Sequence, residues 1–360
     1  MAGVYISWPF CAQKCTYCNF ASGVFPRELE GAYTERLARE LAECDWKMVP
    51  GTIYLGGGTP SQMDAGVVAR LLDLVPGRPW AEATMEAAPG SFDSEAIASW
   101  VAAGINRVSL GAQSFVDLEL RRTGRKHTAE TVFRDVAALR AGGISDFNID
   151  LIAGLAGQTV ESFAESVEAA LALDPPHVSV YMLEVDEDSR LGLEILNNGG
   201  RYGARDIPGD EAIAAMYERA VERLEAAGVL QYEISNFARA GRQSRHNLKY
   251  WKLEPYLGFG ADAHSYFGGR RWQNVELASE YVAAAKLRVT STVANSLEER
   301  FFVGLRLREG VEVGEADWVV HGAAIDRFLG MGLLERVGER VRLTTRGILL
   351  SNEIFQEFLL

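Results

Sequence analysis

The chain has 360 residues, 48% of them hydrophobic and 24% charged, and its formal net charge is −13 at pH 7. This length indicates about two domains, and the composition is typical of a soluble globular protein. The acidic charge argues against a wide surface for nucleic acid or anionic membrane, and no run of 18 apolar residues predicts a membrane-spanning helix.

The start of the chain and its cysteine content both indicate the cytoplasm. The first ten residues, MAGVYISWPF, have neither the basic region nor the long apolar region of a secretory signal. The chain has four cysteines, three of them within eight positions, which does not resemble the disulfide framework of a secreted protein. We therefore expect a protein of a reducing compartment.

The first half of the chain alternates short β-prone runs with longer helical stretches. The β-prone runs are residues 3–7, 52–56, 83–87, 106–110, 147–152 and 177–183. Helices are expected near 28–44, 64–75, 93–103, 129–141 and 159–173. Thr159 and Ser162 form a plausible capped start for the last of these helices. The alternation predicts parallel β/α units, in a barrel or an open sheet, and six units are fewer than the eight of a closed barrel.

The second half of the chain is less regular. Residues 190–210 are rich in Gly, Asn and Asp and predict a long loop, followed by a helix near 209–227. Residues 232–267 are dense in aromatic residues, Gly and Asn, and we expect irregular structure there. The tail predicts a small winged-helix-like unit. Its expected elements are helices near 296–307 and 322–331, a hairpin over 333–345 and a last helix.

Polar residues follow the six β-prone runs at matching positions. The cysteines follow the first run, GGGTP (56–60) follows the second, and Glu86, Gln113, Asp150 and Glu184 stand at or just after the ends of the other four. Taken singly, each polar residue could simply end a strand or cap a helix. Because reactive groups in parallel β/α folds lie at the carboxyl ends of the strands, six such positions together predict a functional rim.

The cysteine cluster has several possible explanations. Cys11, Cys15 and Cys18 give a Cys-x3-Cys-x2-Cys spacing, whereas a structural zinc site usually has four ligands and a disulfide would leave one thiol over. Three buried free thiols are a further alternative, although the loop contains Lys14 and has an exposed character. An iron–sulfur cluster of the [4Fe–4S] type fits best, because thiolates are soft ligands for iron and three of them leave one iron open. The remaining Cys44 is interpreted as a small apolar residue within an amphipathic helix.

Segments along nearly the whole chain resemble the radical S-adenosylmethionine (SAM) enzymes. The resemblance is closest to the group that holds the oxygen-independent coproporphyrinogen III oxidases and the related heme chaperones of the HemW-like branch. Among the matching segments are YISWPFCAQKCTYCNF, IYLGGGTPS, EAAPGS, GINRVSLGAQSF, FNIDLIAGLAGQT and HNLKYW.

The resemblance implies roles for individual residues. Cys11, Cys15 and Cys18 would hold the cluster, whose open iron would chelate SAM. The residues implied to contact SAM are Tyr5, Tyr17, Gly57, Gly58, Thr59, Glu86, Gln113, Arg125 and Asp150. Glycine allows a close backbone approach, and a carboxylate suits the ribose hydroxyls. Arg125 could instead pair with an acidic residue at the surface.

Three features favour the chaperone branch over the oxidases. The position of a fourth cysteine in the oxidases is Phe20 here, only ten residues precede Cys11, and HNLKYW resembles a chaperone motif whose histidine serves heme. His246 is then the implied heme ligand, because a neutral imidazole is a normal axial ligand of heme iron. A structural histidine is the alternative for His246, and His264 is a second candidate ligand.

The resemblance also implies the domain organisation and the partners. The expected division is a partial (β/α)6 TIM-like barrel over 1–190, a segment over 191–294 that completes the barrel and its substrate side, and a winged-helix-like α+β domain over 295–360. The implied function is a heme chaperone that binds a [4Fe–4S] cluster, SAM and heme and delivers heme to a recipient hemoprotein. The alternative is a coproporphyrinogen III oxidase acting on porphyrinogen with an electron donor such as flavodoxin.

A regulatory role in DNA binding is a third hypothesis, since winged helices often bind DNA. The tail from residue 296 contains more acidic residues than arginines and no lysine, which argues against a nucleic-acid partner.

Overall fold

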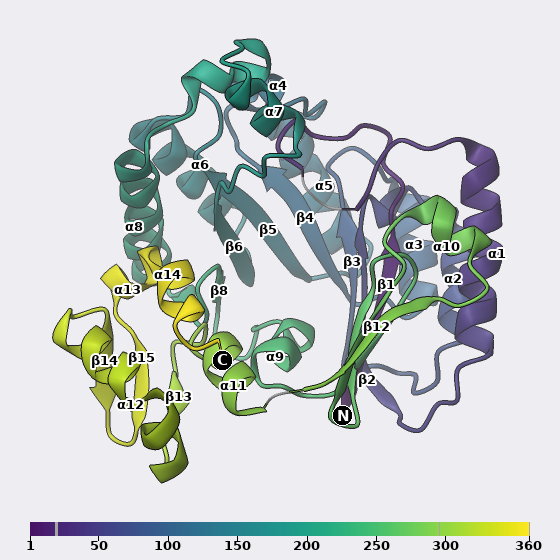
Figure 1. The fold of residues 1–360 in the computed structure, drawn as a ribbon. Coiled ribbons are helices and arrows are strands. Elements are labelled where there is room, and N and C mark those ends of the chain that lie inside the picture. The colour runs from purple at the N-terminus through teal and green to yellow at the C-terminus, as the bar shows by residue number, and fades with distance from the viewer. Residues whose placement is uncertain (19–20, 295, 360) are drawn as a thin grey trace.

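A computed structural model describes residues 1–18, 21–294 and 296–359 (Figure 1). Phe20, which bears on the choice between the two branches, lies outside the described residues. Within the described part, twelve strands form one sheet in the order β12-β11-β10-β9-β1-β2-β3-β4-β5-β6-β8-β7. The sheet has two ends and therefore does not close into a barrel.

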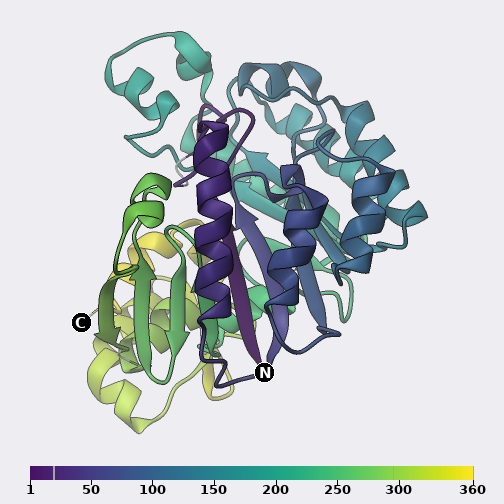
Figure 2. The ribbon, with the colours of Figure 1, turned by 90° about the vertical axis from the view of Figure 1, so that its right-hand side faces the viewer.

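Six consecutive parallel strands form the centre of this sheet. They are β1 (Ala2–Trp8), β2 (Pro50–Gly57), β3 (Glu82–Ala87), β4 (Arg107–Gln113), β5 (Asp146–Ala153) and β6 (His177–Met182). The helices between them lie outside the curved sheet (Figures 1 and 2). These helices are α1 (Arg27–Ala42), α2 (Ala65–Asp73), α3 (Ser94–Ala102), α4 (Asp117–Arg122), α5 (Ala129–Ala141) and α6 (Val160–Ala172). The prediction of an α/β fold with parallel β/α units is confirmed, and only the short α4 was not expected.

Apolar side chains fill the space between the sheet and these helices. β1, β2 and β3 are buried along most of their length, as expected for parallel strands covered on both faces. Large buried side chains from strands and helices form the core, among them Trp8, Tyr33, Trp100, Phe147 and Phe163. Polar residues of the strands are thereby left to the opposite, concave face.

The expectation of irregular structure over 232–267 is wrong. This segment contains β8 (Asn236–Ala238), which pairs antiparallel with β6, and β9 (Tyr256–Phe259), which pairs parallel with β1. Between them lies α9 (Arg245–Trp251), and β10 (His264–Phe267) follows. The strands are only three or four residues long, too short for a clear periodicity, and they form because β1 and β6 offer free edges.

Further short strands complete both ends of the sheet. At one end β11 (Arg270–Asn274) and β12 (Arg288–Val293) continue antiparallel from β10, with α10 (Ala278–Ala283) between them. At the other end β7 (Leu230–Gln231) pairs with β8. The expected helix near 209–227 is α8 (Asp210–Ala226).

The predicted long loop over 190–210 is also wrong in part. It contains α7 (Arg190–Leu196) and a 3-10 helix over Arg201–Asp206. Ser189 caps α7, because its hydroxyl accepts a hydrogen bond from the Gly192 N–H at 2.9 Å. The Leu191 N–H donates to the Thr16 carbonyl at 2.9 Å, so α7 is attached to the cysteine-containing loop.

The tail has the expected hairpin, formed by β14 (Leu334–Val337) and β15 (Arg340–Leu343), and β13 (Val311–Glu312) pairs with β15. Its helices are α11 (Ser296–Gly304), α12 (Glu315–Gly330), α13 (Thr345–Leu349) and α14 (Ser351–Gln356). α12 thus begins seven residues before the predicted 322, and two short helices replace the single last one. Cys44 lies beyond the end of α1, not within a helix as predicted. Among the described residues, no helix is long and apolar enough to cross a membrane.

The start of α6 gives a stability prediction. The Thr159 hydroxyl accepts from the Ser162 N–H at 3.2 Å, and the Ser162 hydroxyl accepts from the Thr159 N–H at 3.0 Å, so the predicted capping pair is present. Replacing Thr159 with Ala should lower the free energy of unfolding by about 1 kcal/mol, because one N–H of the first turn loses its acceptor. Ser99→Ala, within α3, is the matched control, since its hydroxyl only donates to the Glu95 carbonyl. Equal urea midpoints for the two variants would contradict the role of Thr159.

Candidate functional site

The three clustered cysteines lie on one loop that leaves β1. The loop is closed at its base, where the Cys11 N–H donates to the Gly23 carbonyl at 2.8 Å and the Gly23 N–H donates to the Pro9 carbonyl at 2.9 Å. Cys11, Cys15 and Cys18 are unbridged and half-buried. The loop therefore presents three free thiols at the carboxyl end of the sheet.

Neighbouring polar groups surround these thiols. The Arg125 Nη1 lies 3.7 Å from the Cys15 Sγ, and the Ser22 Oγ lies 3.8 Å from the Cys18 Sγ. Burial raises the pKa of the Cys11 thiol, while hydrogen bonds from Thr59 and Ser22 act in the opposite direction. Thr59, predicted from the glycine-rich strip, is thus brought to the cysteines.

The thiols do not form a site for a single ion. Within the described residues, no three side chains of His, Cys, Asp or Glu could together hold one metal ion. A four-iron cluster places each thiolate on a different iron, so its ligands stand further apart than those of one ion. Three soft donors on one loop, beside a guanidinium that can balance the negative charge, fit a cluster.

The glycine-rich strip is packed tightly against the chain that enters the cysteine loop. The Gly58 N–H donates to the Trp8 carbonyl at 2.7 Å and the Thr59 N–H to the Phe10 carbonyl at 2.9 Å. A Cβ at Gly58 would lie 2.6 Å from the Phe10 carbonyl oxygen. Gly57 has φ +113°, in the region that favours glycine. These glycines are required by contacts within the chain, whatever else they bind.

Glu86 stands beside the strip and is held by two donors. Its Oε1 accepts from the Tyr54 hydroxyl at 2.9 Å, and its Oε2 accepts from the Gly57 N–H at 3.0 Å. Burial, together with the nearby charge of Asp150, raises the pKa of Glu86 to about 7 despite these bonds. Tyr54 stacks on Tyr5, with ring centroids 6.2 Å apart. The structure thus groups Tyr5, Glu86 and Gly57, and it adds Tyr54, which the motifs did not indicate.

Gln113 and Arg125 converge over Gly111. A Cβ at Gly111 would lie 2.8 Å from the Gln113 Nε2 and 2.9 Å from the Arg125 Nη2, and the latter donates to the Gly111 carbonyl at 2.5 Å. Gln113 has φ +69°, a left-handed conformation that costs energy for a residue with a side chain. Arg125 thus faces the cysteine loop, and among the residues that the structure describes it forms no ion pair with a surface acid.

Tyr17 and Asp150 complete the predicted set. Burial raises the pKa of the Tyr17 hydroxyl, which lies near the charges of Arg125 and Cys15. Asp150 accepts from the Asn148 Nδ2 at 2.6 Å and from the Ser109 hydroxyl at 3.2 Å, and burial raises its pKa. Of the nine residues expected to contact SAM, Gly57 and Glu86 bond to each other, and Thr59 and Arg125 contact the cysteine loop or the chain that enters it. Asp150 is held by Asn148 and Ser109 instead.

His246 touches this group at one edge, because its ring centroid lies 5.3 Å from that of Tyr54. It is fully buried on α9, and an added Cβ at Gly3, near the start of β1, would lie 3.0 Å from its Cε1. Its Nδ1 lies 2.9 Å from the Thr52 hydroxyl and its Nε2 lies 2.8 Å from the Tyr250 hydroxyl. Burial lowers its pKa to about 3, so the ring is neutral. His246 lies at the opposite end of β1 from the cysteines, and both its ring nitrogens are engaged.

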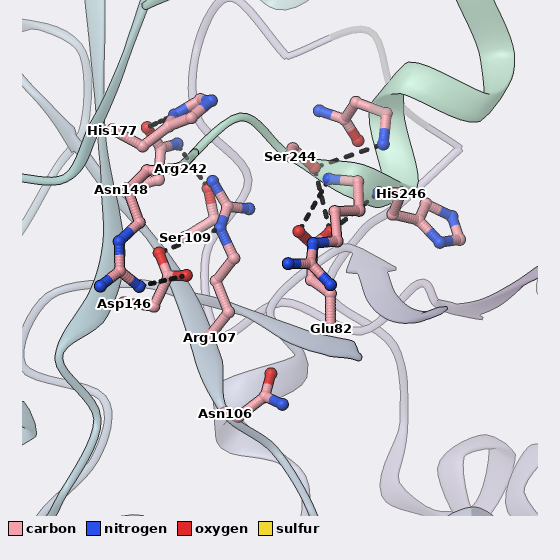
Figure 3. A network of polar contacts seen from close by, with 12 residues as sticks. Glu82, Asn106, Arg107, Ser109, Asp146, Asn148, His177, Arg242, Ser244 and His246 are labelled. Atoms are coloured by element: carbon pink, nitrogen blue, oxygen red, sulfur yellow. Dashed lines mark hydrogen bonds and ion pairs between the residues drawn. The ribbon is translucent and has the colours of Figure 1, made fainter. Parts of the chain in front are cut away.

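A polar network that includes residues at the amino ends of β3 to β6 lies near His246, as Figure 3 shows. Glu82 accepts from the main-chain N–H groups of Arg245 and His246, at 2.8 and 2.9 Å. Further along, His177 lies 2.6 Å from the Asn148 Oδ1 and 2.9 Å from the Tyr232 hydroxyl. The motifs did not indicate Glu82, Asn148 or His177. Asn148 stands two residues before Asp150 in the same predicted strand, and that period of two was the available signal for it.

An aromatic pocket of about 450 Å³ opens beside α9. Its walls include Tyr250, Trp251, Tyr256, Arg271, Phe302 and Val303. Arg271 donates to the Tyr256 hydroxyl at 3.1 Å and pairs with Glu299 at 2.7 Å. The Trp251 Nε1 is buried and has no hydrogen-bond partner among the described residues. His264, the second candidate ligand, is exposed on β10 and does not line this pocket.

Sequence comparisons relate the chain to two family models and to curated proteins. Residues 5–170 match the radical SAM superfamily, and residues 292–350 match the HemN C-terminal domain. The chain is 34% identical to the heme chaperone HemW of Lactococcus lactis over 99% of this chain and 97% of that protein. It is 35% identical to the HemW of Bacillus subtilis over 100% and 99%.

A solved structure shares the whole fold. Coproporphyrinogen III oxidase (HemN) from Escherichia coli superimposes with a TM-score of 0.82 over 99% of this chain and 89% of that chain. The two sequences are 20% identical, so this similarity concerns the fold alone.

The raised pKa of Glu86 gives a prediction about pH. The pKa of its carboxyl in the folded chain is about 7, above its ordinary value of 4.5, so the folded state binds the proton more tightly than the unfolded state. Its contribution to stability is full below about pH 4.5 and is lost as the pH rises through about 7. Glu86→Gln should therefore remove part of the fall in unfolding free energy between these values. At about 1.4 kcal/mol for each pKa step of one, the change from 4.5 to about 7 corresponds to about 3.5 kcal/mol. Because the side chain is partly exposed, we expect a smaller difference of about 2 kcal/mol. Urea unfolding across the range measures it, and parallel pH profiles would contradict it.

Proposed function

Because the chain belongs to the radical SAM superfamily and, within it, to the family of the HemW heme chaperones, we propose that it binds heme and delivers it to hemoproteins. We further propose that it holds a [4Fe–4S] cluster and SAM. The observation that carries the proposal is the presence of two separate sites, a thiol-bearing rim at the carboxyl end of β1 and an aromatic pocket at its amino end. The fold, the full-length similarity and the family support the same function.

The rim has the groups that a cluster and SAM require. Cys11, Cys15 and Cys18 would hold the cluster, and Arg125 would balance part of its negative charge. When bound and reduced, such a cluster supplies an electron that can cleave SAM. Glu86 and Asp150 would accept hydrogen bonds from the amino or ribose groups of SAM, and the stacked Tyr5 and Tyr54 flank Glu86. Electron transfer of this kind implies a donor such as flavodoxin.

The aromatic pocket suits a flat apolar macrocycle with acidic side chains. Tyr250, Trp251, Tyr256 and Phe302 offer aromatic surfaces, and ligand sites are typically apolar with a few polar groups. Arg271 is the cation available to a propionate, because a guanidinium binds carboxylates through paired hydrogen bonds. To bind a propionate, Arg271 would have to break its ion pair with Glu299.

Tyr250 connects this pocket with His246. Its ring lines the pocket, while its hydroxyl bonds to the His246 Nε2 at 2.8 Å. We propose that the Tyr250 side chain moves when heme enters, which frees the Nε2 to bind iron. The imidazole is already neutral above about pH 4, so no proton has to be released. His246 would then be both a structural histidine in the free chain and a ligand in the loaded one.

The separation of the two sites favours a chaperone over an oxidase. β1 has seven residues, so its ends are about 20 Å apart at 3.3 Å per residue. A radical formed at the rim abstracts hydrogen only from a substrate in contact with it. Heme held in the aromatic pocket would lie toward the amino end of β1, with His246 and Tyr54 between Tyr250 and Glu86. A porphyrinogen under oxidation would instead have to lie at the rim. Formation of protoporphyrinogen by reconstituted protein with SAM, reductant and substrate would favour the oxidase instead.

We also propose a separate role for each of three segments of the chain. Residues 1–190 would carry the cluster and SAM, residues 191–294 would form most of the heme side, and residues 295–360 would close the pocket as a small domain. We further propose a cytoplasmic location, which the low cysteine content favours, and no nucleic-acid partner, which the acidic net charge favours. A gel shift at low salt would test the latter.

The cluster proposal predicts the iron content of cysteine variants. Replacing any one of Cys11, Cys15 or Cys18 with Ala should remove most iron and sulfide after anaerobic reconstitution, because each thiolate holds a different iron. Cys44→Ala is the matched control and should keep both, since Cys44 lies away from the loop. A triple variant with the unchanged visible spectrum would exclude the three-thiol cluster.

The heme proposal predicts two separable effects in a heme titration. Arg271→Leu should weaken binding at least tenfold, because a charge-assisted hydrogen bond contributes about 1.5–3 kcal/mol. Arg288→Leu, on the neighbouring strand and outside the pocket, is the control. His246→Ala should shift the Soret band, whereas Tyr250→Phe should strengthen iron binding by freeing the Nε2. If neither Arg271 nor His246 affects the titration, heme does not bind in this pocket.

A further inference from the structure

The ring of His246 is held from three sides. The Glu82 carboxylate accepts from the Ser244 hydroxyl at 3.2 Å and from the His246 N–H at 2.9 Å, so β3 fixes where α9 begins (Figure 3). A Cβ at Gly3 would lie 3.0 Å from the His246 Cε1 and 3.1 Å from its Nδ1, so the ring packs directly against the main chain of β1. The centroid of the Tyr54 ring lies 5.3 Å from that of the imidazole. The imidazole therefore has little freedom to turn within the fold.

The two ring nitrogens meet two different hydroxyl groups. The His246 Nδ1 lies 2.9 Å from the Thr52 Oγ1, and the Nε2 lies 2.8 Å from the Tyr250 hydroxyl. Thr52 stands on β2 and is 3% exposed, and its hydroxyl has no other hydrogen bond within the described residues. A neutral imidazole carries one N–H and one bare nitrogen, so the ring donates to one hydroxyl and accepts from the other. Which hydroxyl donates decides the tautomer of His246.

The chemistry of the two hydroxyls favours the proton on Nδ1. A phenol is a stronger acid than an aliphatic alcohol, so it is the better donor and the poorer acceptor. Tyr250 then donates to the Nε2, and the Nδ1–H of the ring donates to Thr52. In this tautomer the lone pair of the Nε2 points toward Tyr250, whose ring lines the aromatic pocket. A proton on the Nε2 would instead prevent that nitrogen from binding a metal.

We propose that Thr52 is a positioning residue, which holds the proton of His246 on Nδ1 and so keeps the bare Nε2 on the side of the aromatic pocket. Histidines that bind metals generally donate their other N–H to a fixed acceptor, which orients the ring and raises the basicity of the ligating nitrogen. The consequence for heme iron rests on the proposed function, whereas the tautomer is a property of the free chain. The two can therefore be tested separately.

The tautomer is measured by ¹⁵N NMR on the full chain labelled at histidine, without heme. The chain has five histidines, and His246→Gln identifies the ring signals of His246. We expect an Nδ1–H in the wild type. Thr52→Val has nearly the same shape but no acceptor, so the proton should move to the Nε2, where the Tyr250 oxygen accepts it. Thr52→Ser keeps the hydroxyl and should keep the wild-type tautomer. A wild-type ring protonated on Nε2, or a tautomer that Thr52→Val leaves unchanged, would overturn the proposal.

Thr84→Val is the matched control. Thr84 lies on β3 opposite Tyr54, it is fully buried, and its hydroxyl has no hydrogen-bond partner among the residues that the structure describes. The same substitution there removes a buried hydroxyl without removing an acceptor from the ring, and it should leave the tautomer of His246 unchanged. A change as large as that in Thr52→Val would contradict a specific role of Thr52.

A heme titration tests the consequence for iron. Thr52→Val should weaken binding about tenfold or more, whereas Thr52→Ser and Thr84→Val should bind as the wild type does. The heme that still binds to Thr52→Val should have a more positive reduction potential, because a less basic imidazole stabilises ferric iron less. If His246→Ala shifts the Soret band while Thr52→Val changes neither affinity nor potential, the proposal fails and His246 remains the ligand. If neither variant has an effect, His246 is not the heme ligand, and the tautomer of the free chain alone decides the role of Thr52.

Discussion

Close packing between the end of β2 and the chain leaving β1 is the constraint on which the rim depends. Two main-chain hydrogen bonds join Gly58 and Thr59 to Trp8 and Phe10, and a Cβ at Gly58 would overlap the Phe10 carbonyl. This contact fixes where the chain turns into the cysteine loop, and the pairing of Cys11 with Gly23 fixes where it returns. The positions of the three thiols therefore follow from backbone contacts that leave no room for side chains.

The carboxylates near the glycine-rich strip indicate which ligand groups could bind at the rim. Glu86 and Asp150 each accept hydrogen bonds from neutral donors, yet burial raises the pKa of both. Within the described part of the chain neither carboxylate forms an ion pair, although the charge of Arg107 acts to lower the pKa of Asp150, whereas Arg125 lies beside Cys15. A ligand carrying an ammonium group and hydroxyls would relieve that desolvation, and an anionic cluster would satisfy Arg125. The distribution of charge thus matches a cationic group on one side and thiolates on the other.

How far the sequence predicts this structure depends on the length of each element. The six central strands and their helices were predicted because each gives a clear run of five or more residues bounded by turns, and Thr159 marked the start of α6. The three- and four-residue strands β8 and β9 were not, since their pairing with β6 and β1 is decided by tertiary contacts. The motifs pointed to residues around Glu86. Tyr54 and Glu82 could not be identified without the order of the strands in the sheet, which decides which side chains are neighbours. His246 was predicted as a ligand, and only the fold showed that Thr52 and Tyr250 occupy both of its nitrogens.

The same short strands explain how one sheet can carry two candidate sites, the aromatic pocket and the cysteine rim, at opposite ends of β1. β9 pairs with the beginning of β1, with Gly3 opposite Tyr256. This pairing places α9 and the aromatic pocket at the amino end of β1. β3 in turn carries Glu82 near this end and Glu86 at the rim. Between the two ends, the ring of Tyr54 contacts His246 on one side and its hydroxyl donates to Glu86 on the other. If heme binds in the pocket, as we propose, it lies at the amino end of β1, while the thiols that would hold the cluster lie at the carboxyl end. Tyr54, which contacts both His246 and Glu86, is then the side chain through which a change at one end can reach the other.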